Sequence, residues 1–298
     1  MYVRALDYRL HSAKITKQYN LMLLSDVHIE PILNRQDETN IAAILEIAKQ
    51  RQPDAIMIAG DFLDTLEVLY CEVILEKIKS FLHILNSIAP VYIGVGNHDL
   101  GIGFQARQAK YELKMFSEYQ SFIFSTPANL LHNSSAYLDA SKEIKILGLT
   151  LPPEYYNLDK DKHLDAREKH KCLENMLVEN AKGVNEDFTV ALVHSPEHLD
   201  VKMRKTCPGI DLFISGHLHD GLVPVGIFGL TRFSDRGLIS SDGSLFPARA
   251  RGTSRDLDNG LLILGAVKAI PTDVSRAFQL MARPLFPPEI SFLHLIPE

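Results

Sequence analysis

Short apolar runs alternate with longer amphipathic stretches along most of the 298-residue chain. Most of the runs are apolar on successive residues, and most end near a Gly, Asp or His. Their length and unbroken apolar character predict buried strands. The predicted strands are Leu21–Leu24, Ala55–Ala59, Val91–Val95, Ile144–Leu149, Thr189–Val193 and Leu212–Ile214.

Three of the amphipathic stretches place apolar residues at helical spacing. In the first of them Ile44 and Ala48 share one face, and Asp37 or Thr39 is a candidate N-cap. The predicted helices are Thr39–Gln50, Glu67–Ile88 and Asp165–Ala181. Strands alternating with helices favour an α/β fold in which helices cover a sheet.

The pattern changes after His219, where Gly and Pro become frequent and the helical spacing fades. Two short extended pieces follow, at Leu261–Leu264 and Ile290–Leu295. We expect residues 220–298 to form a strand-rich part of the same domain that adds strands to a second sheet. Since no linker, repeat or low-complexity tract interrupts the chain, residues 1–298 are predicted to be a single domain.

Composition excludes several classes of protein. Apolar residues make up 46% and charged residues 23% of the chain, as expected of a globular protein with a core. The net charge of -6 argues against a long nucleic acid as partner, which needs a basic surface. The cysteines are sparse and form no CxxC pair, no apolar run approaches the roughly 18 residues of a membrane span, and the N-terminus lacks the apolar core of a signal peptide. We therefore expect a cytoplasmic protein.

Five polar motifs lie directly after predicted strands, where α/β folds bind their ligands. They are Ser25-Asp26-Val27-His28, Gly60-Asp61-Phe62-Leu63-Asp64, Gly96-Asn97-His98-Asp99, His194-Ser195 and Gly216-His217-Leu218-His219. Carboxylates and imidazoles beside buried strands must be paired or bound to metal, because burying them alone is costly. A structural polar network explains one or two such motifs but not five in order.

The order and spacing of these motifs resemble the calcineurin-like metallophosphoesterase superfamily, and the match runs from Asp26 to His219. The resemblance implies an α/β fold with a two-sheet β-sandwich flanked by helices, in α/β/β/α layers. The tail is also similar to one bacterial branch, the envelope-lipid-type phosphodiesterases, at Arg249–Gly252 and Pro287–Ile290.

The resemblance also implies a role for each residue of the motifs. Two divalent metal ions would share Asp61 as a bridge. The first ion would be completed by Asp26, His28 and His219, and the second by Asn97, His194 and His217. His98 would be the catalytic histidine, with Asp64 as its orienting partner.

Elementary chemistry agrees with this interpretation. Two metals about 3.5–4 Å apart clamp a phosphoryl group and turn a water into a hydroxide nucleophile. Oxygen and nitrogen ligands without thiolate suit Mn, Fe or Zn, and we expect Mn. Adjacent side chains diverge, so His98 is free of the metal that Asn97 would bind and can act as general acid. Spacing leaves open whether Asp64 or Asp99 orients it.

The sequence departs from some members of the superfamily. Protein phosphatases place Arg directly after the second Asp of the Gly-Asp motif, where this chain has Thr65, and a common Gly-Gly after the last motif is Asp220-Gly221 here. Without that Arg, fewer cations face a dianionic phosphate, which favours hydrolysis of a phosphodiester or pyrophosphate. A phosphomonoesterase acting on a small phosphorylated metabolite, or a non-catalytic binding scaffold, are the alternatives.

Two segments are candidates for substrate selection. Tyr155 and Tyr156 either line a pocket or pack their own loop. Residues 228–255 are basic and apolar together, which is typical of a phosphate or lipid-headgroup surface with peripheral membrane contact, or of a solvated loop. We expect a small phosphorylated substrate or a nucleotide- or lipid-linked one. The sequence does not determine the oligomeric state.

Overall fold

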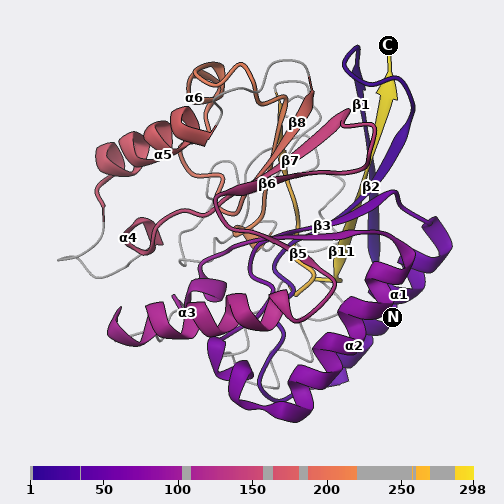
Figure 1. The fold of residues 1–298 in the computed structure, drawn as a ribbon, viewed down its shortest axis with the longest axis vertical. Coiled ribbons are helices and arrows are strands. Elements are labelled where there is room, and N and C mark those ends of the chain that lie inside the picture. Colours follow the sequence, from indigo (N-terminus) through magenta and orange to yellow (C-terminus); the bar gives the residue numbers. More distant parts are fainter. Residues whose placement is uncertain are drawn as a thin grey trace.

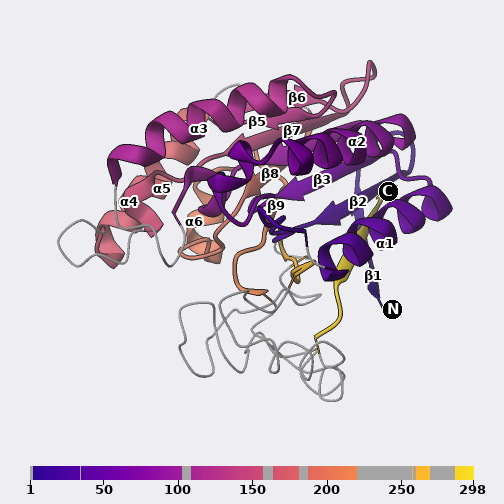
Figure 2. The same cartoon turned by 90° about the horizontal axis from the view of Figure 1, so that it is seen from below.

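The computed structural model describes residues 3–33, 35–102, 109–156, 164–180, 187–219, 257, 260–268 and 286–298, without the side chains of residues 35, 36 and 109–113. Within them, two β-sheets pack face to face, and helices cover the outer face of each (Figures 1 and 2). The predicted α/β/β/α layering is confirmed.

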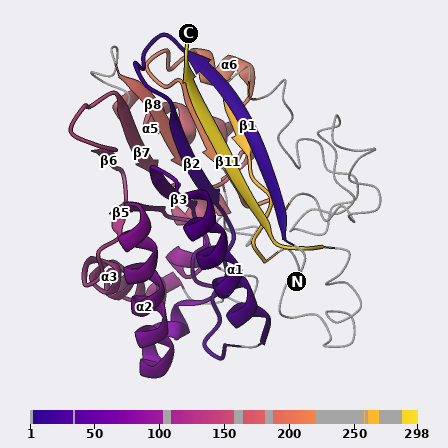
Figure 3. The same ribbon diagram turned by 90° about the vertical axis from the view of Figure 1, so that its right-hand side faces the viewer.

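The first sheet has six strands and is mostly parallel. In spatial order the strands are β1 (Arg4–Ser12), β11 (Glu289–Pro297), β2 (Tyr19–Leu24), β3 (Ala55–Ala59), β4 (Val91–Gly94) and β5 (Asn129–Leu131). β11 is parallel to β1 and antiparallel to β2. The two ends of the chain thus form one edge of the sheet together, as Figure 3 shows.

The second sheet has five strands. Their order is β10 (Leu261–Ile263), β9 (Leu212–Ser215), β8 (Phe188–Val193), β7 (Ile144–Leu149) and β6 (Ser134–Tyr137). All neighbours are parallel except β6 and β7. We expected the C-terminal strands to join the second sheet. β10 does so, whereas β11 lies in the first.

Both faces of the central strands are buried, which is why these strands are continuously apolar in the sequence. Met22 and Leu24 of β2 pack under helices, while Leu21 and Leu23 face the second sheet. The first sheet is covered by α1 (Arg35–Arg51), α2 (Glu72–Ile88) and α3 (Ala109–Phe124). The second is covered by α4 (Pro153–Tyr156), α5 (Ala166–Asn180) and α6 (Val201–Lys205).

The stretch predicted as one helix over Glu67–Ile88 is two elements, which corrects the prediction. A 3₁₀ helix, η1 (Leu66–Tyr70), is followed by Cys71 in an extended conformation, and α2 begins after it. Val73 in the first turn of α2 is 68% exposed, because it does not share the helix face of the buried Ile74, Ile78 and Leu85.

Several elements lie in segments where the sequence pattern predicted neither a helix nor a strand, among them β1, α3 and the short strands β5 and β6. None of the helices within the described residues combines the length and the apolar composition needed to cross a bilayer. Asp220, Gly221 and the basic segment 228–255 lie outside the described residues. The extent of the domain therefore stays a prediction.

Candidate metal centre

The five motifs lie at the ends of β2, β3, β4, β8 and β9, and main-chain hydrogen bonds join their loops. The loop after β2 continues its pairing with the loop after β3, because the Asp26 and His28 N–H groups donate to the carbonyl oxygens of Gly60 and Asp61 at 3.2 and 3.1 Å. The Gly216 N–H donates to the His194 carbonyl oxygen at 2.9 Å. Neighbouring parallel strands therefore bring distant motifs to one place.

Several side chains of the site stand on backbone in the left-handed region. The φ angles are 52° at Asp26, 47° at His28, 51° at Asp61, 70° at His217 and 47° at His219. Such a conformation costs about 1–3 kcal/mol per residue and persists only where the surroundings impose it. So many in one cluster indicate that the site is held in shape for function.

Two glycines allow the motif loops to approach closely. A Cβ atom on Gly216 would lie 1.6 Å from Ser25 Oγ, and one on Gly96 would lie 2.2 Å from Asp61 Oδ1. A side chain at Gly216 would push Ser25 and the Asp26 carboxylate out of place, and one at Gly96 would push the Asp61 carboxylate. Gly96 and Gly216 are thus required by sterics rather than by φ.

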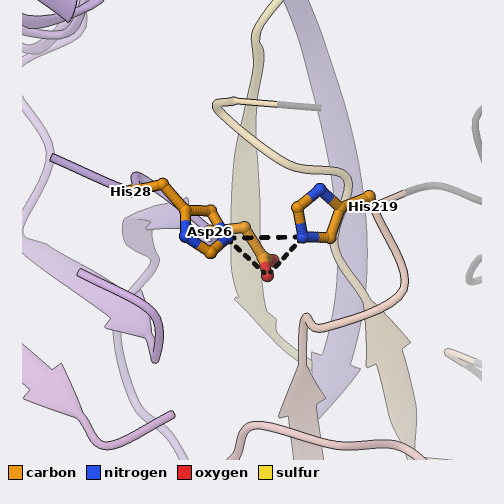
Figure 4. Close-up of side chains that lie close together, drawn as sticks. All are labelled: Asp26, His28 and His219. Atoms are coloured by element: carbon orange, nitrogen blue, oxygen red, sulfur yellow. Dashed lines mark hydrogen bonds and ion pairs between the residues drawn. The ribbon is translucent and has the colours of Figure 1, made fainter. Parts of the chain in front are cut away.

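The first group of predicted ligands comes together as expected. Asp26 Oδ1 lies 3.3 Å from His219 Nε2 and 3.8 Å from His28 Nε2, and the two Nε2 atoms are 3.4 Å apart (Figure 4). Burial works to raise the pKa of Asp26, but the neighbouring His219 and His194 outweigh it and lower the pKa. The carboxylate is therefore ionised and able to bind a cation.

The second group consists of Asp61, His194 and His217, whose candidate ligand atoms lie within 4.8 Å of one another. His194 Nε2 is 3.0 Å from Asp61 Oδ2, and its Nδ1 donates to the Ala59 carbonyl oxygen at 2.7 Å. Burial lowers the pKa of His217 to about 3, with the nearby His194 adding to the effect. His217 is neutral near pH 7, the form that binds metal.

Asp61 connects the two groups. Its Oδ2 lies 3.0 Å from His194 Nε2 and 3.7 Å from Nε2 of His28, which belongs to the first group. The other oxygen, Oδ1, accepts a hydrogen bond from the His98 N–H at 2.9 Å. A carboxylate in this position can contact two cations at once.

Asn97 supplies a direct test of whether the site suits a metal. Its Nδ2 donates to the Ile102 carbonyl oxygen at 2.8 Å, which fixes the amide. Its Oδ1 is buried and has no hydrogen-bond partner among the described residues. An orphaned buried acceptor is costly in a folded protein. A cation bound there would remove that cost, so the donor set fits the predicted metals.

His98 and Asp64 are close, but through the main chain. His98 Nδ1 contacts the Asp64 carbonyl oxygen, whereas Asp64 Oδ1 lies 3.3 Å from His28 Nδ1. Burial raises the pKa of Asp64, but the contact with His28 outweighs it and lowers the pKa. The carboxylate thus orients a predicted metal ligand, and the carbonyl oxygen orients His98.

Asp99, the other candidate for orienting His98, faces the main chain. It accepts hydrogen bonds from the N–H groups of Phe62 at 3.1 Å, Leu63 at 3.1 Å and Gly96 at 3.0 Å. Burial, helped by the nearby charge of Asp61, raises the pKa of Asp99 to about 6. Asp99 therefore fixes the loops after β3 and β4 to each other.

The two tyrosines have different surroundings. The Tyr156 ring lies with its centroid 5.5 Å from that of His217, beside the second group. The Tyr155 hydroxyl donates to the Glu197 carbonyl oxygen at 2.8 Å, and its ring is in the core. Tyr156 borders the site, while Tyr155 packs in the core and against the loop after β8.

No sequence motif pointed to Lys268, a buried residue whose Nζ donates to the His28 carbonyl oxygen at 3.1 Å. The feature of the sequence that could have identified this lysine is that it is a single charge within the apolar run that follows Gly260. A lone lysine in such a run must find acidic partners if the run is buried.

Comparison with known proteins agrees with this geometry. The model of the family described as calcineurin-like phosphoesterase matches residues 19–221. The chain belongs to this family. Residues 19–221 are therefore a metal-dependent phosphoesterase domain, whose clustered carboxylate and imidazole side chains support the binding of divalent metal.

Two proteins are similar to this chain over part of their length. The Caenorhabditis elegans protein named "Putative metallophosphoesterase F40B5.2" is 26% identical over 207 residues, which cover 68% of this chain and 36% of that protein. The chain thus matches about a third of the length of this relative. A crystal structure of TT1561 of Thermus thermophilus overlaps with a TM-score of 0.39 at 12% identity, covering 66% of this chain and 81% of that one.

Proposed function

We propose that this member of the calcineurin-like phosphoesterase family uses two divalent metal ions to hydrolyse a phosphodiester or pyrophosphate bond. The observation that carries the proposal is the position of Asp61 Oδ2, 3.0 Å from His194 and 3.7 Å from His28. A carboxylate shared by two adjacent sets of ligands is what a dinuclear centre requires. Asp26, His28 and His219 would hold one ion, and Asn97, His194 and His217 the other.

When bound, paired ions polarise the phosphoryl group and lower the pKa of a water between them. The ligands have oxygen and nitrogen atoms without sulfur, which suits Mn, Fe or Zn, and we propose Mn. Before an ion binds, the chain keeps the Asp26 carboxylate ionised and the His217 imidazole neutral near pH 7. It also fixes the backbones of the first two motifs through the hydrogen bonds between the loops after β2 and β3.

His98 is proposed as the general acid. The Asp64 carbonyl oxygen accepts from Nδ1, so a proton delivered to a leaving oxygen comes from Nε2 of the doubly protonated ring. The main-chain N–H of His98 is tied to Asp61, which keeps the imidazole beside the proposed bridge. Its ring centroid is 4.6 Å from that of His28.

The preference for a diester or pyrophosphate is supported at Thr65. Its hydroxyl accepts from the Glu67 N–H at 3.3 Å and caps η1, so this position supplies a helix cap and no cation. We propose a small phosphorylated, nucleotide-linked or lipid-linked substrate, within one domain that includes the C-terminal strands.

A metal-supplemented activity panel tests the proposal. The protein, stripped of metal and reloaded with Mn²⁺, is assayed on a model phosphodiester, a matched phosphomonoester and a nucleotide-linked pyrophosphate. We expect the diester or the pyrophosphate to be hydrolysed at least about tenfold faster than the monoester. Comparable rates on the monoester would instead favour a phosphomonoesterase. A protein that binds no transition metal would refute the proposal that it is a metal-dependent hydrolase.

A further inference from the structure

Lys268 lies just beyond β10 and is only 3% exposed, although it carries an ammonium group. An ion buried this deeply is costly unless it is paired and hydrogen-bonded. Its Nζ lies 2.9 Å from Asp37 Oδ1, in the first turn of α1, and also contacts Glu30 Oε1 in the loop after β2. One side chain therefore joins three separate parts of the chain.

The third hydrogen bond of the Lys268 ammonium group is made with the first motif of the predicted metal site. An ammonium group has three N–H donors, and the third acceptor here is the His28 carbonyl oxygen, 3.1 Å from Nζ. The main-chain N–H of Lys268 donates to the Asp26 carbonyl oxygen at 3.0 Å. Since all three donors have acceptors, the position of the side chain is fully determined.

These two acceptors are the carbonyl oxygens of the two left-handed residues of the first motif. Asp26 has φ 52° and His28 has φ 47°, so the relaxed conformation of either residue would swing its side chain away. The preceding residue of the C-terminal segment adds to the restraint, because the Val267 N–H donates to the Ser25 carbonyl oxygen at 3.0 Å. The segment after β10 thus holds the whole loop.

We propose that Lys268 is a positioning residue for the first metal group. It fixes the backbone at Asp26 and His28 so that their side chains meet His219, and it does not itself contact a metal or the substrate. The inference rests on the two-metal function proposed above. It adds to that function a determinant from a part of the chain beyond the five motifs and the family match at residues 19–221.

The test is Lys268→Met, which removes the ammonium and keeps the apolar stem. Metal-free protein is titrated with Mn²⁺ by calorimetry, with the bound ions followed by electron paramagnetic resonance. Lys268→Met is expected to weaken one of the two sites about 10–100-fold and to leave the other unchanged, as removal of an outer partner of a metal ligand does. Lys77→Met is the matched control. It removes an exposed lysine that pairs with Glu38, the neighbour of Asp37, at 3.1 Å, and both affinities should stay as in the wild type.

Two further backgrounds identify which site is affected. With His194→Ala only the first group is complete, and adding Lys268→Met should weaken the binding that is left. With His219→Ala only the second group is complete, and the same addition should have no effect. An effect confined to the His219→Ala background would overturn the proposal.

If Lys268→Met does not fold, as judged by circular dichroism, Glu30→Gln takes its place, because Glu30 is partly exposed and loses only its charge. A severalfold weakening of the first site is then expected. Unchanged affinities at both sites in the folded variant would overturn the role of Lys268. A wild-type protein that binds a single Mn²⁺ would overturn the two-metal proposal instead.

Discussion

Asp64 holds His98 with its main-chain carbonyl oxygen and not with its carboxylate. The carboxylate is used elsewhere, 3.3 Å from Nδ1 of His28. One residue thus serves both the proposed acid and a predicted metal ligand, by two different chemical groups. Substitution of the side chain should separate the two tasks, because the carbonyl oxygen is present whatever the side chain is.

Asp64→Asn is expected to weaken metal binding by about 10–100-fold, since it removes the negative partner of His28. The dependence of the rate on the pKa of the leaving group should stay as in the wild type, because the contact between His98 and the carbonyl oxygen is preserved. Metal titration and a series of substituted phenyl diesters measure the two effects. A variant with normal metal affinity and a changed leaving-group dependence would show that the carboxylate acts on His98.

His98→Ala should retain both metals and lose about 10²–10⁴-fold in kcat on diesters with a poor leaving group. The loss should be much smaller on a nitrophenyl diester, whose leaving group needs no proton. Metal content measured on the same preparation is the control. Full activity on the poor leaving group would remove His98 from the role of acid.

Asp99→Ala should lower the free energy of unfolding by several kcal/mol. It leaves the buried N–H groups of Phe62, Leu63 and Gly96 without acceptors, each at a cost of about 1–3 kcal/mol. Asp99→Asn keeps one acceptor oxygen and should cost less. Urea unfolding of the metal-free proteins provides the comparison, and an Ala variant as stable as the wild type would contradict the assignment.

The metal-free protein should lose stability as the pH rises from about 6.5 to 9. Burial opposes the charge on His194, but the Asp61 carboxylate outweighs it and raises the pKa to about 9, above the ordinary value of 6.5. A raised histidine pKa contributes stability that is fully present below the unfolded pKa and is lost as the pH passes the folded one. Thermal unfolding of metal-free protein across this range tests the sign.

The same shift predicts proton release on metal binding. Near pH 7.5, Mn²⁺ must displace the proton on His194, so about one proton should be released from this residue and the affinity should rise up to about pH 9. Calorimetry in buffers of different ionisation enthalpy counts the protons. In His194→Ala this contribution should be missing, and an unchanged count there would place the proton elsewhere.

The sequence by itself determined the central strands and the polar motifs at their ends. Strand β3 begins and ends where its apolar run does, because a strand buried on both faces requires unbroken apolar residues, and β7 also has the predicted bounds. The motifs could be recognised because a charged group at the end of such a strand must have a partner, and their order resembles one superfamily.

Only the tertiary structure decided what holds the site in place. Lys268 and His28 are separated by 240 positions, and no local pattern links an isolated lysine to a particular carbonyl oxygen. The roles of Asp64 and Asp99 also depended on the direction of each side chain, and spacing along the chain does not fix that direction. Local patterns report burial and backbone preference, whereas the partner of a buried polar atom is selected when distant strands pack against each other.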